Sequence, residues 1–177
     1  MIFKRIKSVE DNDFLKVKKF FDTSFPYSER KDADEIRDDI SDDRYYLYAV
    51  SLKENEDPIA VLAYWKLNNC IYGEYLAVNP KLRNSGIGKE ILSELKNHID
   101  APMILEIEKP VDEITTRRKG FYERNGFVLN GHKHYQPAYH KDCSPLEMNV
   151  MTYPREFSKD EYNEFYKELL DIAPKFQ

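Results

Sequence analysis

Cysteine is scarce in this 177-residue sequence, and long apolar runs are missing. The two cysteines, Cys70 and Cys143, are too few and too far apart for a disulfide framework, which favours a reducing compartment. Residues 1–7 lack the sustained apolar stretch of a secretory signal, and no later segment approaches the length of a membrane span. We therefore expect a cytoplasmic protein without a membrane partner.

Positive charge is also in deficit. The sequence has 27 lysines and arginines against 32 aspartates and glutamates, so its formal net charge is −5. Nucleic-acid binding depends on basic residues that neutralise phosphates, and the balance therefore argues against a nucleic-acid partner. No repeat or low-complexity linker interrupts the chain. Its length and its 41% hydrophobic content suit one domain that spans residues 1–177.

The hydrophobic pattern predicts an α/β chain. Alternating and β-rich segments predict seven strands, at residues 1–7, 45–52, 59–67, 70–78, 103–108, 127–135 and 146–153. Apolar stripes at helical spacing predict helices after Asp11–Asp13, after Gly88, over 112–125 and after Ser158, where Ser158 and Glu161 form a capping-box pattern. We expect an antiparallel meander that leads into the strand at 70–78, with the strand at 103–108 parallel to it.

The segment 73–95 contains the most informative pattern: a strand, a short loop and a helix. Gly86 and Gly88 allow the loop dihedral angles that a Cβ atom would forbid. The start of the helix offers unpaired backbone N–H groups, and Arg83 and Lys89 flank them. The helix dipole and these donors together favour a bound phosphate.

Two common phosphate-binding motifs fail the spacing test. A Walker loop requires a glycine where Arg83 stands and a serine or threonine where Glu90 stands, which argues against a magnesium–nucleoside triphosphate site. A dinucleotide fingerprint requires a third glycine at Ile91.

The remaining pattern is Arg-x-x-Gly-x-Gly after a strand that ends in Leu-Ala-Val-x-Pro. It resembles the acetyl-CoA loop of the GNAT acetyltransferases. A second stretch, Gly120-Phe-Tyr-Glu-Arg-Asn-Gly-Phe127, resembles the Phe-Tyr-x-x-x-Gly-Phe segment of the same family, and the resemblance covers roughly residues 44–153. It implies a GNAT-like acyl-CoA N-acyltransferase fold, a mixed and mostly antiparallel sheet of about seven strands that is split at its centre and flanked by helices. It also implies acetyl transfer from acetyl-CoA, the cosubstrate, to a primary amine, without a covalent enzyme intermediate.

The resemblance assigns the cofactor contacts. Backbone groups of the strand are expected to pair with the pantetheine arm and supply an oxyanion donor, and the loop to hold the diphosphate, so that the cofactor lies between the strands at 70–78 and 103–108. These residues are Leu76, Ala77, Val78, Arg83, Asn84, Ser85, Gly86, Ile87, Gly88 and Lys89. Many family members have an asparagine and an alanine where this sequence has Thr115 and Arg118. Thr115 is expected to replace the asparagine as a shorter hydrogen-bonding side chain. Arg117 or Arg118 either contacts a phosphate of CoA or belongs to a solvated basic face of the helix.

Amine acetylation needs a proton acceptor for the amine and a proton donor for the leaving thiolate. Tyr122 is the candidate acid, since the family tyrosine at this place has that role and a phenol is protonated at neutral pH. Glu74 is the leading base, because its Glu-x-Leu-x-Val context resembles the polyamine acetyltransferases; alternatively it orients the ammonium while water takes the proton. Glu29 is the alternative candidate for the base. It lies in a mainly acidic segment that either borders the acceptor site or forms a solvated helix and loop.

His132, His134, His140 and Cys143 lie close together in the sequence. They lack the tight pairs of zinc sites, so we expect no metal and instead histidines that line an acceptor cleft or a hairpin surface. The acceptor is either a small, polyamine-like amine or a protein N-terminus or lysine. A non-catalytic acyl-CoA-binding module is the alternative from another class, and the assembly, a homodimer for example, is left open.

Overall fold

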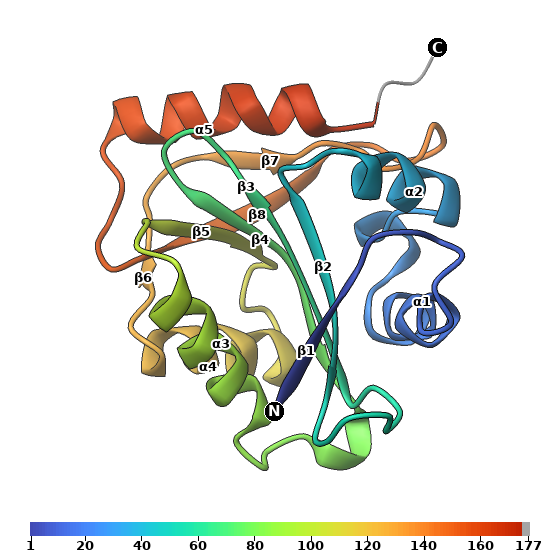
Figure 1. The fold of residues 1–177 in the computed structure, drawn as a ribbon. Helices are drawn as coiled ribbons and strands as arrows, with labels where there is room; N and C mark the ends of the chain where they lie inside the picture. The colour runs from blue at the N-terminus through green and yellow to red at the C-terminus, as the bar shows by residue number, and fades with distance from the viewer. Residues whose placement is uncertain (175–177) are drawn as a thin grey trace. The chain divides into compact units, whose positions relative to one another are not determined.

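The computed structural model describes residues 1–174 (Figure 1). The chain divides into two compact units: Met1–Lys66 with Glu74–Ile99, and Leu67–Gly73 with the chain from Asp100 onward. The expectation of one domain over residues 1–177 stays a prediction. Within residues 1–174, no helix combines the length and the apolar character needed to cross a membrane.

The first unit contains an antiparallel meander with helices against it. Its elements are β1 (Ile2–Ile6), α1 (Phe14–Ser24), the 3-10 turn η1 (Tyr27–Glu29), α2 (Ala33–Ser41), β2 (Tyr45–Ser51), β3 (Ala60–Lys66), the second part of β4 (Ile71–Val78), the 3-10 turn η2 (Pro80–Leu82) and α3 (Ile87–His98). Strand β2 pairs with both β1 and β3 in antiparallel register. In Figure 1, α1 and α2 lie beside each other against this meander.

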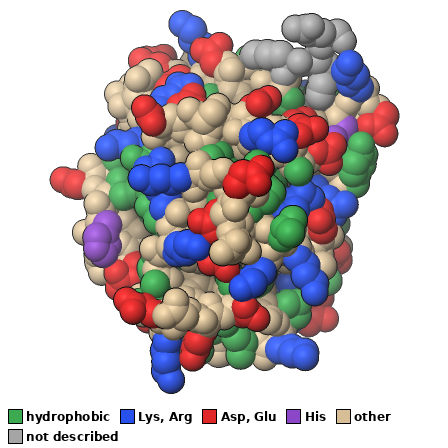
Figure 2. All heavy atoms as spheres, turned by 45° about the vertical axis from the view of Figure 1, so that its right-hand side comes forward, with side chains coloured by type: hydrophobic (Ala, Val, Ile, Leu, Met, Phe, Trp, Pro, Cys, Tyr) green, Lys and Arg blue, Asp and Glu red, His purple; other side chains and the backbone are tan. Residues whose placement is uncertain are grey.

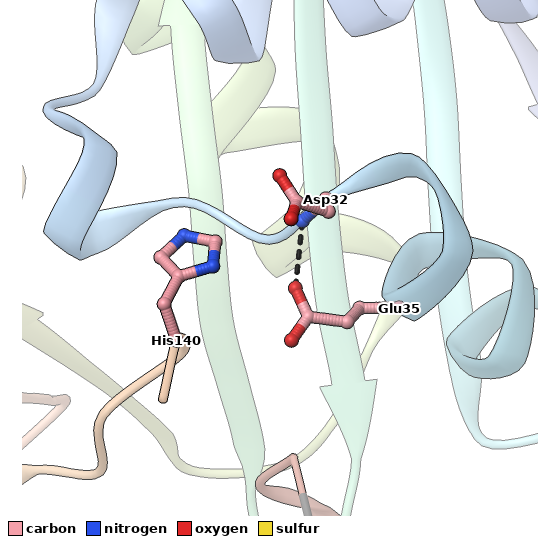
Figure 3. A group of neighbouring side chains, drawn as sticks. All are labelled: Asp32, Glu35 and His140. Atoms are coloured by element: carbon pink, nitrogen blue, oxygen red, sulfur yellow. Dashed lines mark hydrogen bonds between the residues drawn. The ribbon is translucent and has the colours of Figure 1, made fainter. Parts of the chain in front are cut away.

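Local sequence explains how these helices are placed. The apolar stripe of α1 buries Phe14, Val17 and Phe21, and the ring of Phe21 meets that of Tyr75 on β4 edge-on at 4.6 Å. Helix α2 begins at a capping box, in which the backbone N–H of Asp32 donates to Glu35 Oε2 at 2.7 Å (Figure 3). The cap satisfies a donor that the first helical turn would otherwise leave without a partner.

The second unit is built around strand β8. Its elements are the first part of β4, β5 (Met103–Ile107), α4 (Glu113–Arg124), β6 (Val128–Leu129), β7 (His134–Gln136), β8 (Leu146–Tyr153) and α5 (Lys159–Ile172). Strands β5, β6 and β7 all pair with β8 in antiparallel register. Helix α5 begins at the predicted capping box, where Ser158 Oγ accepts from the backbone N–H of Glu161.

The parallel pairing of β4 with β5 is short. It joins Ile71 to Met103, Tyr72 to Ile104 and Gly73 to Leu105, and thus covers only the first three residues of β4. The predicted parallel neighbour of β4 is therefore confirmed, whereas β1 with β2, β2 with β3, and β5, β6 and β7 with β8 pair in antiparallel register. The predicted class, a mixed and mostly antiparallel sheet flanked by helices, is confirmed as well.

One strand prediction is wrong. Residues 127–135 form two short strands rather than one, so the sheet within residues 1–174 has eight strands instead of about seven. Asn130 causes the break: its side chain donates to the Val128 carbonyl and to Thr152 Oγ1, and accepts from the backbone N–H of Phe157. These bonds replace the regular ladder and let the chain leave β8 before it rejoins at His134.

Charges of both signs are mixed on the face that Figure 2 shows, with acidic and basic side chains interspersed. This agrees with the small net charge of the sequence.

Candidate functional site

The predicted phosphate loop leads directly into helix α3. Asn84 and Gly86 both have positive φ angles, 64° and 91°, and Gly86 is the N-cap of the helix. The Ser85 hydroxyl donates to the Leu82 carbonyl and fixes the turn from η2. A Cβ atom added at Gly86 would meet nothing within 4 Å, so the left-handed backbone is the reason for glycine here.

The backbone N–H groups at this helix start are available. Within residues 1–174, no hydrogen bond is donated by the N–H groups of Gly86, Ile87, Gly88 or Lys89, and the first helical bond runs from Glu90 N to Gly86 O at 3.0 Å. Gly86 and Lys89 are exposed. A row of N–H donors without internal partners at the positive end of a helix fits an anionic diphosphate.

The strand that precedes the loop ends in a compact turn. Leu76 and Val78 are partly buried on β4, and Ala77 is buried. The Asn79 side chain accepts from Lys81 N at 3.0 Å, and the backbone N–H of Asn79 donates to the Ile59 carbonyl at 2.8 Å. The strand, the turn and the loop thus form one continuous piece within the first unit.

Tyr122 lies in the last turn of α4, in the second unit. The residue is only partly buried, yet desolvation of its phenol raises its pKa to about 12, a rise that the nearby Arg118 opposes. The phenol is therefore protonated at neutral pH and can donate a proton.

Thr115 and Arg118, the two departures from the family pattern, already have partners. Thr115 Oγ1 donates to Asp112 Oδ1 at 2.7 Å and accepts from the backbone N–H groups of Val111 and Asp112, so this buried hydroxyl caps α4. Arg118 forms an ion pair with Glu108. Cofactor contacts by either residue stay a prediction, and each contact would compete with these bonds.

Glu74 lies in a buried ion cluster. Its side chain is 2% exposed, and Glu74 Oε1 is 2.8 Å from the ammonium of Lys31, which also lies 2.7 Å from Asp39 Oδ2. Sequence reasoning missed Lys31 and Asp39. The sequence signal at this place was only a densely charged and mainly acidic stretch, which is equally typical of a solvated helix.

Glu29, the competing carboxylate, ends η1 and is partly exposed. Its neighbour Tyr27 is 47% exposed, which places this turn at the surface of the first unit.

In the second unit His134 and His140 are buried, and His132 is partly buried. His134 is fully buried: its Nε2 pairs with Glu106 Oε1, and its Nδ1 lies 2.9 Å from the Tyr162 hydroxyl. Glu106 Oε2 also accepts from the Tyr72 hydroxyl at 2.6 Å. His132 Nε2 lies 3.0 Å from the Phe157 carbonyl. These contacts favour a structural role for His132 and His134. Glu106 is the single charged residue of the apolar strand Met103–Ile107, and this was the sequence signal that could have identified it.

Comparison with known families identifies the chain. The family model of the GNAT acetyltransferases, "Acetyltransferase (GNAT) family", matches residues 14–127. This agrees with the resemblance seen in the glycine loop and in the Phe-Tyr-x-x-x-Gly-Phe segment. No curated protein matches the chain significantly.

Solved structures support the same fold. A GNAT-family protein from Bacteroides thetaiotaomicron is 28% identical, covers 99% of this chain and 100% of its own, and superposes with a TM-score of 0.86. The Escherichia coli ribosomal-protein-S18-alanine N-acetyltransferase is 16% identical, with coverage of 90% and 96% and a TM-score of 0.59. An aminoglycoside 6′-N-acetyltransferase complexed with coenzyme A is 14% identical, with coverage of 86% and 96% and a TM-score of 0.59.

Proposed function

The chain belongs to the GNAT family and is an acetyl-CoA-dependent N-acetyltransferase, and we propose that its acceptor is the primary amine of a small, polyamine-like molecule. The main support for acetyl-CoA binding is the row of backbone N–H donors at the start of α3. The charge of the cluster around Glu74 supports the proposed acceptor. This buried cluster holds two carboxylates and one ammonium. Because burial raises the pKa of Asp39 to about 7, the cluster carries at most one net negative charge at neutral pH, which favours a cationic amine over a neutral acceptor.

In this proposal the loop holds the cofactor diphosphate. The N–H groups of Gly86, Ile87, Gly88 and Lys89 donate to its oxygens, and the Arg83 and Lys89 side chains add positive charge. Leu76, Ala77 and Val78 offer main-chain groups to the pantetheine arm. Acetyl-CoA supplies an activated acyl group as a thioester. Asn84, with its positive φ, and Ser85, whose hydroxyl donates to the Leu82 carbonyl, shape the turn, and both belong to the proposed cofactor contacts.

Two proton transfers complete the reaction. Glu74 takes the proton that the acceptor amine loses as its nitrogen bonds to the thioester carbonyl, either directly or through a water molecule, and Glu29 is the alternative acceptor of this proton. Tyr122 gives its proton to the sulfur as the carbon–sulfur bond breaks. Placing amine and thioester together contributes as much as about 7–11 kcal/mol of the barrier reduction in well-oriented systems.

An acetyl-CoA consumption screen tests the acceptor. The panel contains polyamines, aminoglycosides, amino acids and short peptides with a free N-terminus or lysine. Turnover with small diamines or polyamines and none with peptides is the expected result. Turnover with peptides alone would reassign the acceptor to a protein. Thermal stabilisation by CoA without turnover on any amine would make the protein an acyl-CoA-binding module.

We also propose a cytoplasmic location, which the free cysteines Cys70 and Cys143 and the acetyl-CoA cosubstrate support.

A further inference from the structure

Lys31 is the most deeply buried cation of the first unit. The residue is 1% exposed and lies between η1 and α2. Its ammonium makes two short ion pairs, 2.7 Å to Asp39 on α2 and 2.8 Å to Glu74 on β4, and its backbone N–H donates to the Tyr75 hydroxyl at 3.2 Å. The lysine thus ties a helix and a loop to the strand that carries the proposed base.

Burial penalises the charge of both carboxylates, and the ammonium of Lys31 offsets this penalty. The Glu74 and Asp39 side chains are 2% and 10% exposed, and a buried charge is tolerated only when it is paired. Burial raises the pKa of Asp39 to about 7, against the opposing effect of Lys31. Burial alone would lower the pKa of Lys31, but the two carboxylates outweigh it and raise the pKa above its usual value. Lys31 is therefore a permanent cation.

The surroundings of the cluster include a second cation, since the Arg44 guanidinium lies 5.8 Å from the centre of the Trp65 ring. The Lys31 ammonium lies 5.4 Å from the centre of the Trp65 ring. Burial raises the pKa of Tyr45 well above its usual value, and the negative charges of Glu74 and Asp39 raise it further. This phenol is therefore neutral. Glu35 adds further negative charge near Asp39.

The same unit contains a surface cluster in which a lysine likewise pairs with two carboxylates. Lys4 lies 2.8 Å from Asp11 and 2.9 Å from Asp13, but the Lys4 side chain is 48% exposed and the two aspartates are 22% and 21% exposed. Water can replace Lys4 as the partner of its carboxylates, whereas it has little access to Glu74. Lys4 therefore provides a matched control for the removal of Lys31.

We infer that Lys31 is a positioning residue for the acetyl transfer: its ammonium keeps Glu74 ionised and fixed in orientation, so that Glu74 can accept the proton of the acceptor amine. This inference rests on the proposed function of Glu74. Lys31 acts through Glu74 and touches neither the acceptor nor the cofactor. Asp39 holds Lys31 from the other side and balances part of its charge.

The test compares two variants, Asp39→Asn and the double variant Lys31→Met/Asp39→Asn. The double variant leaves Glu74 as the one carboxylate of the cluster without its cation, and it avoids the repulsion between two unpaired buried carboxylates that Lys31→Met alone would create. Relative to Asp39→Asn, we expect kcat/KM for the amine to fall tenfold or more at pH 7. The acidic limb of the kcat/KM profile should move up by at least one pH unit, while KM for acetyl-CoA changes less than twofold. Lys4→Met should leave both quantities unchanged.

A purely structural role for Lys31 gives a different result. The melting temperature would fall in the double variant, but the pH profile would keep its position, and this outcome overturns the inference.

A second measurement does not need turnover. Infrared spectroscopy of the folded double variant at pH 7 should show a protonated carboxylic acid band that is absent from Asp39→Asn and from Lys31→Met/Asp39→Asn/Glu74→Gln. Absence of this band from the double variant overturns the inference even if no acceptor is found. Presence of the band in an enzyme that acetylates no amine would instead refute the proposed function and leave the control of Glu74 ionisation by Lys31 standing.

Discussion

The carbonyl of Tyr122 accepts a hydrogen bond from the backbone N–H of Phe127 at 3.0 Å, and the rings of the two residues meet edge-on at 5.5 Å. Gly126, with φ of 82°, makes the turn that brings them together at the end of α4. This contact gives the spacing of the tyrosine, the glycine and the phenylalanine in this chain a structural reason. It also fixes the orientation of the proposed acid.

Replacing Tyr122 by phenylalanine removes the proposed proton donor but keeps the ring contact with Phe127. We expect turnover to fall about 10²–10⁴-fold, because that is the usual contribution of general acid catalysis, with little change in CoA affinity. Steady-state kinetics and calorimetric CoA titration measure the two effects. Tyr166→Phe, on α5, is the control. With a pKa of about 12, the phenol of Tyr122 should not itself cause a loss of activity below about pH 10. Unchanged turnover in Tyr122→Phe would remove this residue from the acid role.

Gly86→Val tests the cofactor loop. A β-branched residue at φ of 91° is strained by about 1–2 kcal/mol, so we expect the N–H row to shift and CoA binding to weaken by about tenfold or more. Gly131→Val is the matched control, because a Cβ atom at Gly131 also meets nothing within 4 Å and its φ is not positive. Equal CoA dissociation constants for the two folded variants would contradict the loop assignment.

Glu161 makes the stability of α5 dependent on pH. Its pKa is lowered to about 2 by Arg155 first and by the Ser158 cap next. The unfolded chain takes up this proton at higher pH, so the contribution is complete above about pH 4.5 and is lost as the pH falls towards 2. We expect Glu161→Gln to lower the free energy of unfolding by about 1 kcal/mol at pH 7 and by much less at pH 2.5. Urea unfolding at the two pH values checks this, and an equal loss at both would refute it.

Asn130→Ala should destabilise the second unit. The variant leaves the buried N–H of Phe157 without its acceptor and removes two donated hydrogen bonds, which costs about 2–3 kcal/mol. Val128→Ala, at a residue 40% exposed, should cost less than about 1 kcal/mol. Chemical denaturation measures both variants, and similar losses would show that the Asn130 bonds do not hold this break in the sheet.

Features that depend on neighbours in the sequence could be predicted without the structure. The capping box at Ser158 and Glu161 and the left-handed glycine before α3 follow from a few consecutive residues, because helix ends must satisfy their own N–H groups. Alternating and β-rich segments along the chain predicted β4, β5 and β8. The break at Asn130 could not be predicted, because its side chain bonds to Thr152 and Phe157, far along the chain.

The candidate site divides in the same way. The sequence by itself determined the loop that we propose for the cofactor, since backbone N–H groups at a helix start need only glycine at the right spacing. It also placed Glu74 on β4, but only the tertiary structure decided that Lys31 and Asp39 surround that carboxylate. The same holds for Glu106 and His134 in the second unit. The physical reason is that a buried charge must find its partner wherever the fold brings one, and no local spacing rule encodes that choice.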